Sequence, residues 1–362
     1  MFLRNAWYVA AWDHEVSADA LLGRILLDEP VVLYRTRDRR VVALEDRCCH
    51  RHYPLHKGTL TQDCIQCRYH GFTYDGSGRC VRVPGQSNAP ETARVKSYPV
   101  VERHRWVWVW MGDPVRADES KIVDFHWLDH PEWRAKGTTF HVKSNYELIL
   151  ENLLDLTHLT FLHGGTIGTY ATAENAEVST RATDHDVTVT RWIMNSVAPA
   201  TYIRARGFTS NIDRWQFINF TPPCYVRLDI GGLATGQRAR ERKTAAFAAE
   251  GLLADGLEMR NLNAFTPETS KTTHYFWAQA HNFSLDDPSV TDMLFDQIDE
   301  AFHQDWEVFE TQQRWIELAP TAPRINVRAD AGQIQSVRLL RRKIEEEALS
   351  DRPARGPSSQ NP

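Results

Sequence analysis

The sequence predicts an α+β protein in which a small all-β domain precedes a larger domain of strands and helices. Three observations lead to this prediction. Short β-branched runs and turn residues fill the first 115 residues, a helical period begins near residue 145, and strand-like runs and long helices follow from residue 178 onward. We therefore expect domains at residues 1–115 and 116–350, and a tail at 351–362 whose composition is typical of disorder.

The first domain contains three strand signals. Residues 24–46, RILLDEPVVLYRTRDRRVVALED, hold two apolar runs around a charged turn and predict a hairpin. Residues 72–83 place the turn DGSG between two strand-like segments and predict another. In residues 100–114 three tryptophans alternate along a strand that stops at Gly112 and Pro114.

The second domain begins with the segment YELILENLLDLTHLTFLH, residues 146–163, whose apolar spacing predicts a helix that ends at the following Gly-Gly. Strand-like runs occupy residues 178–230. Residues 233–257 are rich in Ala, Gly and Arg without a clear period, so we expect a mobile loop or lid there. Helices are predicted at 288–317 and 335–349.

Composition restricts the partners of this chain. The net charge of −5 and the short, mixed basic runs give no reason to expect nucleic-acid binding. Neither a signal peptide nor an apolar run of about 18 residues is present, so we expect a cytoplasmic protein with no membrane span. Five of the six cysteines lie within 33 residues among histidines, which favours metal binding over disulfides.

A first group of candidate ligands comprises Cys48, His50, Cys67 and His70. The spacing is C-x-H, sixteen residues, then C-x-x-H, so that two tight loops each supply one Cys and one His. Two Cys and two His also suit a structural zinc site. Zinc fingers, however, usually pair Cys with Cys and His with His along the chain. A [2Fe–2S] cluster with Cys₂ on one iron and His₂ on the other requires the mixed supply seen here.

The segments CCHRHYPL and CRYHGFTYDGSG resemble the two cluster loops of Rieske iron–sulfur proteins. The resemblance implies a [2Fe–2S] cluster on the four candidate ligands. Many family members carry Pro where this chain has Cys49, and respiratory Rieske proteins carry a bridging Cys where it has Tyr69. The resemblance therefore implies a low-potential, ferredoxin-like cluster, with Cys49, Cys64 and Cys80 as bystanders.

A second group of candidate residues, Asn152, Asp155, His158 and His163, lies in the predicted helix at 146–163. Asp155 and His158 share one face of a regular helix, about 60° apart, whereas His158 and His163 are about 140° apart. Both histidines can reach one metal only if the helix loosens or ends between them. Two His and a carboxylate form the facial triad of non-haem Fe(II) oxygenases; the alternative is that these are ordinary polar residues of a helix.

Together the two groups resemble the large subunit of Rieske non-haem iron oxygenases, in which a curved antiparallel sheet grips long helices. The resemblance implies a mononuclear Fe(II) held by His158, His163 and a carboxylate of the late helix. Asp305 is the best match to that carboxylate, with Glu307 and Glu310 as competitors.

The resemblance also assigns Asp155 a role between subunits. Asp155 resembles the aspartate that links a cluster histidine of one subunit to an iron-ligand histidine of the next, with Asn152 supporting the junction. His70 of one chain would then face Asp155 of a neighbour, which implies a homotrimer.

The likeness over residues 1–345 is to the group that contains vanillate O-demethylase, dicamba monooxygenase and toluenesulfonate methyl-monooxygenase. It implies O₂-dependent monooxygenation or demethylation of a small, anionic aromatic substrate, with electrons from a separate reductase or ferredoxin, since no G-x-G-x-x-G is present. Asn219 and Asn263 are the predicted donors to the anion. Two alternatives stay open: a cis-dihydroxylating dioxygenase with the same metals, and an electron carrier or zinc-stabilised binding protein without a second iron.

Overall fold

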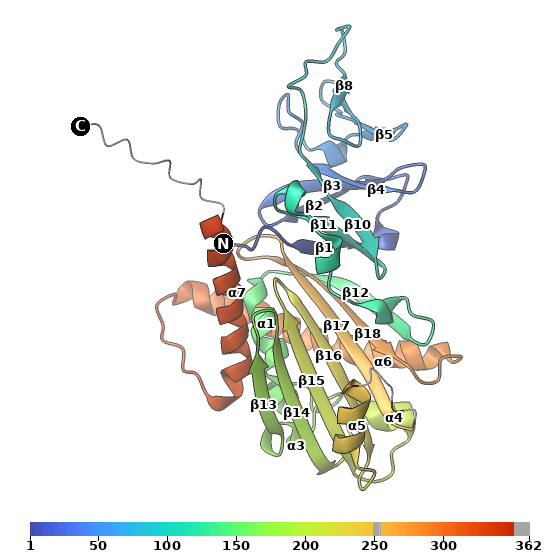
Figure 1. Ribbon diagram of the computed structural model, residues 1–362, viewed down its shortest axis with the longest axis vertical. Helices are drawn as coiled ribbons and strands as arrows, with labels where there is room; N and C mark the ends of the chain where they lie inside the picture. The colour runs from blue at the N-terminus through green and yellow to red at the C-terminus, as the bar shows by residue number, and fades with distance from the viewer. Residues whose placement is uncertain (249–252, 254, 351–362) are drawn as a thin grey trace, which may run out of the picture.

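The computed structural model describes residues 1–248, 253 and 255–350. The predicted fold class is confirmed: small sheets form the N-terminal region, and one large antiparallel sheet with helices follows (Figure 1). The blue and cyan N-terminal region lies beyond one end of the strands of the large sheet (Figure 1).

The N-terminal region contains three small antiparallel sheets. The first has the order β1 (Trp7–Trp12), β11 (Trp106–Trp110), β10 (Val100–Arg103). The second has the order β2 (Leu22–Leu26), β3 (Glu29–Arg35), β4 (Val41–Glu45), β9 (Ser97–Tyr98). The third has the order β5 (Thr59–Thr61), β6 (Cys64–Gln66), β7 (Thr73–Tyr74), β8 (Cys80–Arg82). Both predicted hairpins and the tryptophan strand are confirmed.

Strand β11 joins the two parts of the molecule. All five of its residues are buried, because the first sheet is covered on both faces. The ring centroids of Trp108 and of Tyr225 in the large sheet are 5.4 Å apart. The Tyr225 hydroxyl donates a hydrogen bond to the Trp7 carbonyl at 2.6 Å, and the Thr266 hydroxyl donates to the Val9 carbonyl at 2.7 Å. One apolar core therefore runs from the N-terminal region into the large sheet.

The large sheet has seven strands in the order β12-β18-β17-β16-β15-β14-β13. Their bounds are β12 (Arg134–Val142), β13 (Glu177–Ala182), β14 (Val187–Ser196), β15 (Ile212–Thr221), β16 (Tyr225–Ala234), β17 (Leu257–Pro267) and β18 (Thr273–His281). In every neighbouring pair the strands run antiparallel, and alternate residues of each strand therefore point to opposite faces of the sheet.

The helices lie on both faces of this sheet. On the inner face, α1 (Tyr146–Leu154) packs between the sheet, α6 (Pro288–Leu318) and α7 (Ala331–Ser350). Three short helices, α2 (Leu159–Leu162), α3 (Tyr170–Glu174) and α4 (Ala200–Arg206), lie around them. On the outer face, α5 (Ala239–Ala248) packs on β15 and β16 (Figure 1).

Two sequence expectations are corrected. The helix predicted at 146–163 is broken at Asp155, so α1 is followed by a 3₁₀ turn, η6 (Leu156–His158), and by α2. The loop or lid predicted at 233–257 is wrong over 239–248, where α5 forms. Lys243 on the buried side of α5 forms ion pairs with Asp229 and Glu258 of the sheet. A search for hydrophobic periodicity does not detect such contacts. Positions 249–252 and 254, and the predicted tail at 351–362, lie outside the described residues.

The helices predicted at 288–317 and 335–349 are confirmed as α6 and α7. Within the described part of the chain, the helices are all too short or too polar to cross a bilayer.

Candidate metal centres and active-site cavity

The break in the helix at Asp155 brings two histidines to one side of the chain. Asp155 has extended backbone angles, φ −120° and ψ 98°, and its carboxylate accepts hydrogen bonds from the Thr157 backbone N–H at 3.0 Å and from the Thr157 hydroxyl at 2.9 Å. This is an N-cap, and it restarts the chain as η6. His158 then ends η6 and His163 follows α2, where the helix stops.

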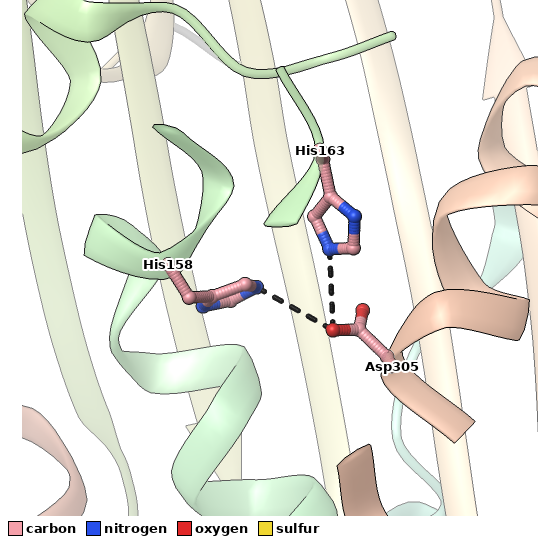
Figure 2. A group of neighbouring side chains, drawn as sticks. All are labelled: His158, His163 and Asp305. Atoms are coloured by element: carbon pink, nitrogen blue, oxygen red, sulfur yellow. Dashed lines mark hydrogen bonds and ion pairs between the residues drawn. The ribbon is translucent and has the colours of Figure 1, made fainter. Parts of the chain in front are cut away.

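His158, His163 and Asp305 form one compact group, which Figure 2 shows converging on a single carboxylate oxygen. Nε2 of His163 lies 3.2 Å and Nε2 of His158 3.7 Å from Oδ1 of Asp305. His163 and Asp305 are buried, whereas the His158 side chain is 24% exposed. Two imidazole nitrogens and one carboxylate within 4.8 Å of one another are a donor set that fits Fe(II) with coordination positions left open.

Each of these histidines has its second ring nitrogen occupied. Nδ1 of His158 donates to the backbone carbonyl of Asp155 at 2.6 Å, and Nδ1 of His163 donates to Oε1 of Gln304 at 2.6 Å. Such bonds fix the tautomer that leaves Nε2 free for a metal. The sequence analysis missed Gln304, whose only signal is that it directly precedes Asp305 on α6.

The pKa values of the two histidines shift in opposite directions. Burial lowers the pKa of His158, although Asp305 opposes this effect. Burial also acts to lower the pKa of His163, but the hydrogen bonds to Asp305 and Gln304 outweigh it and the pKa is raised. A metal bound at Nε2 of His163 would take the place of the proton that the ring gains there when it becomes charged.

Asn152 and Asp155 lie beside this group in different ways. Nδ2 of Asn152 donates to Oδ1 of Asp305 at 2.9 Å and lies 3.5 Å from Nε2 of His158. Asp155 reaches the His158 ring through its backbone carbonyl, while its half-buried carboxylate binds Thr157. Within the chain, the Asp155 carboxylate therefore keeps lone pairs free for a further donor.

The competing carboxylates of α6 do not join the group. Glu307 is exposed. Glu310 accepts hydrogen bonds from Nε1 of Trp306 at 2.7 Å and from the Lys143 backbone N–H at 3.0 Å. Asp305 is thus the carboxylate that the fold places against both histidines.

The two cluster loops have the same backbone turn. The N–H of Cys48 donates to the carbonyl of Tyr53, and the N–H of Cys67 donates to the carbonyl of Phe72, five residues on in each case. A residue with positive φ closes each turn: His52 at 56° in the first and Gly71 at 73° in the second. The loops therefore present their side chains from two hairpin tips that face each other.

Cys48, His50, Cys67 and His70 come together at these tips. Both thiols are 2% exposed, and the His50 and His70 ring centroids are 4.7 Å apart. Nδ1 of His50 is buried and has no hydrogen-bond partner among the described residues. Burial and the neighbouring Cys48 thiol raise the pKa of the Cys67 thiol, so a thiolate here needs a cation such as iron. These observations fit a cluster bound by two Cys and two His.

The remaining cysteines of this region have other surroundings. Cys49 is exposed, and its Sγ lies 3.2 Å from the hydroxyl of Tyr74, which also lies 3.1 Å from Sγ of Cys48. Cys80 points its Sγ toward the Arg82 carbonyl at 3.3 Å, and Cys64 is half-buried in β6.

A cavity opens beside Asn152, His158 and Asp305. Its walls are largely apolar, with contributions from α1, α6 and the inner face of the sheet, among them Leu153, Leu228, Ile230, Met259 and Phe302. The polar side chains that line it elsewhere are Tyr202, Arg214, Gln216 and Asn261. An apolar chamber with a few polar groups beside a metal-binding group is typical of a small-molecule active site.

The two amides predicted to bind the substrate anion do not line this cavity. Asn219 points to the outer face of the sheet, where Nδ2 donates to Asp186 at 2.8 Å. Asn263 is fully buried, and Nδ2 donates to Asn261 at 2.8 Å. The strand pattern placed both amides in the right sheet. It did not show which face of the sheet, or which positions along the strands, border the cavity. Asn261, two residues before Asn263 on β17, does line the cavity.

Comparison with known families agrees with the geometry of both groups. The sequence model of the vanillate O-demethylase oxygenase C-terminal domain matches residues 142–346, and that of the Rieske [2Fe-2S] domain matches residues 6–99. The chain belongs to the Rieske non-haem iron oxygenases, in the group of the vanillate O-demethylase oxygenases.

Individual relatives cover almost the whole chain. The toluene-4-sulfonate monooxygenase system iron-sulfur subunit TsaM1 of Comamonas testosteroni is 43% identical over 96% of this chain and 98% of its own. A vanillate O-demethylase oxygenase subunit of Pseudomonas sp. strain HR199 is 34% identical over 94% and 95%. The crystal structure of dicamba monooxygenase bound to 3,6-dichlorosalicylic acid superposes with a TM-score of 0.87 at 32% identity, covering 96% of this chain and 99% of that one.

The chain is therefore the oxygenase component of a Rieske-type enzyme with a [2Fe–2S] cluster and a mononuclear non-haem iron. This class supports the monooxygenase prediction over the dioxygenase alternative, and it excludes a simple electron carrier.

Proposed function

We propose that this chain is a terminal oxygenase that hydroxylates or O-demethylates a small aromatic acid, and that it uses the residue set described above to do so. Cys48, His50, Cys67 and His70 would hold the [2Fe–2S] cluster. The single observation that carries the proposal is the convergence of His158, His163 and Asp305 on one point at the wall of an apolar cavity. A substrate in that cavity would lie next to the iron.

The two metal groups divide the chemistry. When bound, the cluster supplies electrons one at a time, and the mononuclear iron supplies the binding and reduction of O₂. The chain's own side chains hold and orient the participants. Gln304 and the Asp155 carbonyl fix the histidine tautomers, and Asn152 holds the Asp305 carboxylate by its Oδ1. The apolar walls exclude water from an aromatic ring.

Electrons would pass between subunits. The sheet β5–β8, which borders the cluster loops, lies at the end of the N-terminal region that is remote from the large sheet (Figure 1). His70 is exposed at this tip. The free lone pairs of the Asp155 carboxylate can accept an N–H from a neighbour's histidine. Such a contact joins unlike surfaces and can close into a ring, and the family resemblance supports a ring of three subunits.

The electron source would be a separate reductase or ferredoxin, since the sequence contains no G-x-G-x-x-G fingerprint. Exposed aromatic and basic side chains at the cluster tip, Arg51, Arg68 and Tyr69, offer a surface on which an acidic carrier can dock.

The test is a count of metals. The protein, expressed and purified without oxygen, should contain about three irons and two acid-labile sulfides per chain. The dithionite-reduced sample should show the EPR signal of a His-ligated cluster. A native protein with about two irons that takes up no more on reconstitution would refute the proposal. Zinc in place of iron at either group would refute it as well.

A further inference from the structure

The active-site cavity contains a buried cation that the metal centre does not use. Arg214 of β15 is 1% exposed, and it lines the same cavity as Asn152, His158 and Asp305. It points to the inner face of the sheet, as does Gln216 two residues further along the strand.

Arg214 has weak partners for a buried guanidinium. One N–H group donates to the Thr169 hydroxyl at 3.4 Å, and the guanidinium lies over the Tyr202 ring, 5.0 Å from its centroid. It also lies close enough to the Tyr202 hydroxyl to counteract the rise in the pKa of Tyr202 that burial causes. Its Nε has no hydrogen-bond partner among the described residues, and no carboxylate of the described part of the chain forms an ion pair with it.

Buried cations on the outer face of the same sheet are treated differently. Lys243 lies 2.7 Å from Glu258 and 2.9 Å from Asp229, and Arg260 lies 2.9 Å from Asp229. On the inner face, Arg191 also has no carboxylate within ion-pair distance in the described ranges, but its N–H groups bind the Thr172 carbonyl and Oε1 of Gln216. Arg191 and Arg214 thus both lie on the inner face without an ion-paired carboxylate among the described residues, and of the two it is Arg214 whose Nε has no hydrogen-bond partner there.

A buried charge without a partner costs several kcal/mol. Active sites can hold groups that lower the stability of the protein for the sake of function, and an anionic ligand in this cavity would supply the partner that Arg214 lacks. Gln216 lies beside Arg214, and because its Oε1 accepts from Arg191, its amide N–H₂ can face the cavity. An arginine fork with an adjacent amide is suited to the paired oxygens of a carboxylate or sulfonate.

We infer that Arg214 binds the anionic group of the substrate, with Gln216 as a second donor, and that the enzyme selects aromatic monoanions over neutral aromatics. The apolar walls, including Leu228, Ile230 and Met259, would enclose the ring between this anion site and the metal group. This inference rests on the proposed function, and it adds the residue that recognises the anionic group of the substrate.

The test is a calorimetric titration of the anaerobic holoenzyme after its iron has been counted. The probes are 4-methylbenzoate and 4-methylbenzenesulfonate, each compared with its neutral amide. The wild-type protein should bind at least one acid more tightly than the matching amide. A hydrogen-bonded charge pair is worth roughly 1.5–3 kcal/mol. Arg214→Gln should therefore weaken acid binding about 10- to 100-fold and change amide binding less than about 3-fold.

Two further variants serve as controls. Arg214→Lys keeps the charge without the fork and should retain part of the acid preference. Arg227→Gln removes the same charge from the outer face, where Arg227 binds Asn219, and should change neither affinity. The affinities of 4-methylbenzoate and 4-methylbenzenesulfonate for the wild-type protein are then compared. The acid that binds more tightly shows whether the site prefers a carboxylate or a sulfonate.

Other results would overturn the inference. A wild-type protein that binds the acids no better than the amides would do so, as would equal losses for acids and amides in Arg214→Gln. Because an unpaired buried charge is removed, Arg214→Gln should melt at or above the wild-type temperature; a fall of several degrees with equal losses would assign Arg214 a structural role. If Arg214→Gln does not fold, an unchanged acid preference in Arg214→Lys overturns the inference. A normal iron count in any of these cases would leave the two metal centres and the oxygenase chemistry of the proposed function standing, and only the recognition of the anion by Arg214 would fail.

Discussion

The cluster loops and the mononuclear group are built by the chain in opposite ways. Each cluster loop is a local turn in which a backbone N–H reaches a carbonyl five residues on, and the ligand candidates lie within 23 residues of sequence. The mononuclear group joins residues 142 positions apart, from the segment after α1 and from the middle of α6. The first depends on two hairpins, whereas the second depends on the packing of the whole catalytic sheet.

The two regions also differ in exposure. His70 is exposed at the tip of its loop, whereas Asp305 is 4% exposed between helices and sheet. A cluster at an exposed tip can contact an electron donor and a neighbouring subunit, whereas the buried site of the mononuclear iron can exclude water from the substrate. Independent loss of either centre, with the other left intact, is the strongest expectation from this difference.

The largest effect is expected at the buried centre. Asp305→Asn should remove the mononuclear iron, lower the count from about three to two irons per chain, and abolish turnover, because an amide is a poor ligand for Fe(II). The reduced cluster should keep its EPR signal. Glu307→Gln, two residues along α6 and exposed, is the matched control and should retain all the iron.

The reverse loss is expected at the exposed tip. Cys67→Ser should remove the cluster and leave about one iron per chain. Circular dichroism should show the large sheet unchanged, because the loop is local. The control is Cys64→Ser, three residues earlier in β6, which should keep the cluster colour. If Cys64→Ser also bleached the protein, the assignment of bystander and ligand would be wrong.

A smaller effect is expected from the residues that orient the iron ligands. Gln304→Met removes the acceptor for Nδ1 of His163 and should weaken Fe(II) binding about 10- to 100-fold. Gln304→Glu retains an acceptor and should bind Fe(II) nearly as well as the wild type. The measurement is equilibrium dialysis against Fe(II) without oxygen. Equal behaviour of the two variants would contradict the role of this bond.

The smallest effect concerns the junction between the two regions. Nε2 of His274 donates to the Ile25 carbonyl at 3.1 Å. Burial lowers the pKa of His274 to about 4, with Glu268 opposing and Arg24 and His141 adding to the shift. Because the folded pKa lies below the unfolded value, stability present above pH 6.5 is lost as the pH falls toward 4.

This loss can be measured by urea unfolding followed by tryptophan fluorescence. Between pH 7.5 and pH 5, the wild type should lose about 2 kcal/mol more than His274→Gln, which cannot be protonated. Equal losses in both proteins would show that His274 is not the group that titrates.

The same contrast explains what the sequence could predict. The cluster ligands and the two histidines lie in short motifs, so their residue types and spacing were sufficient to propose them. Asp305 was proposed from the pattern of one helix, and the fold then placed it against His158 and His163. Their roles as ligands stay predictions until metal is measured.

Features that depend on the three-dimensional path of the sheet were not predicted. Asn219 and Asn263 were proposed as substrate contacts. The face of the sheet to which Asn219 points and the position of Asn263 along its strand keep both away from the cavity, and other residues line it. Arg214 and Gln304 carry no motif, and their surroundings are set by segments far away in the sequence. The helix α5 escaped detection because Lys243, rather than an apolar stripe, anchors it to the sheet.

The central claim is that the cluster of one chain works with the iron of another. Its most direct test uses mixed oligomers of Cys67→Ser and Asp305→Asn chains, co-expressed and purified through two different tags. Nitric oxide is added to convert the mononuclear Fe(II) of the first chain from an EPR-silent to an EPR-active spin state, and the reduced cluster of the second chain is observed by pulsed EPR. The account predicts faster spin relaxation of the cluster in the mixed oligomer than in Asp305→Asn oligomers alone. Equal relaxation rates would place the two centres too far apart and contradict it.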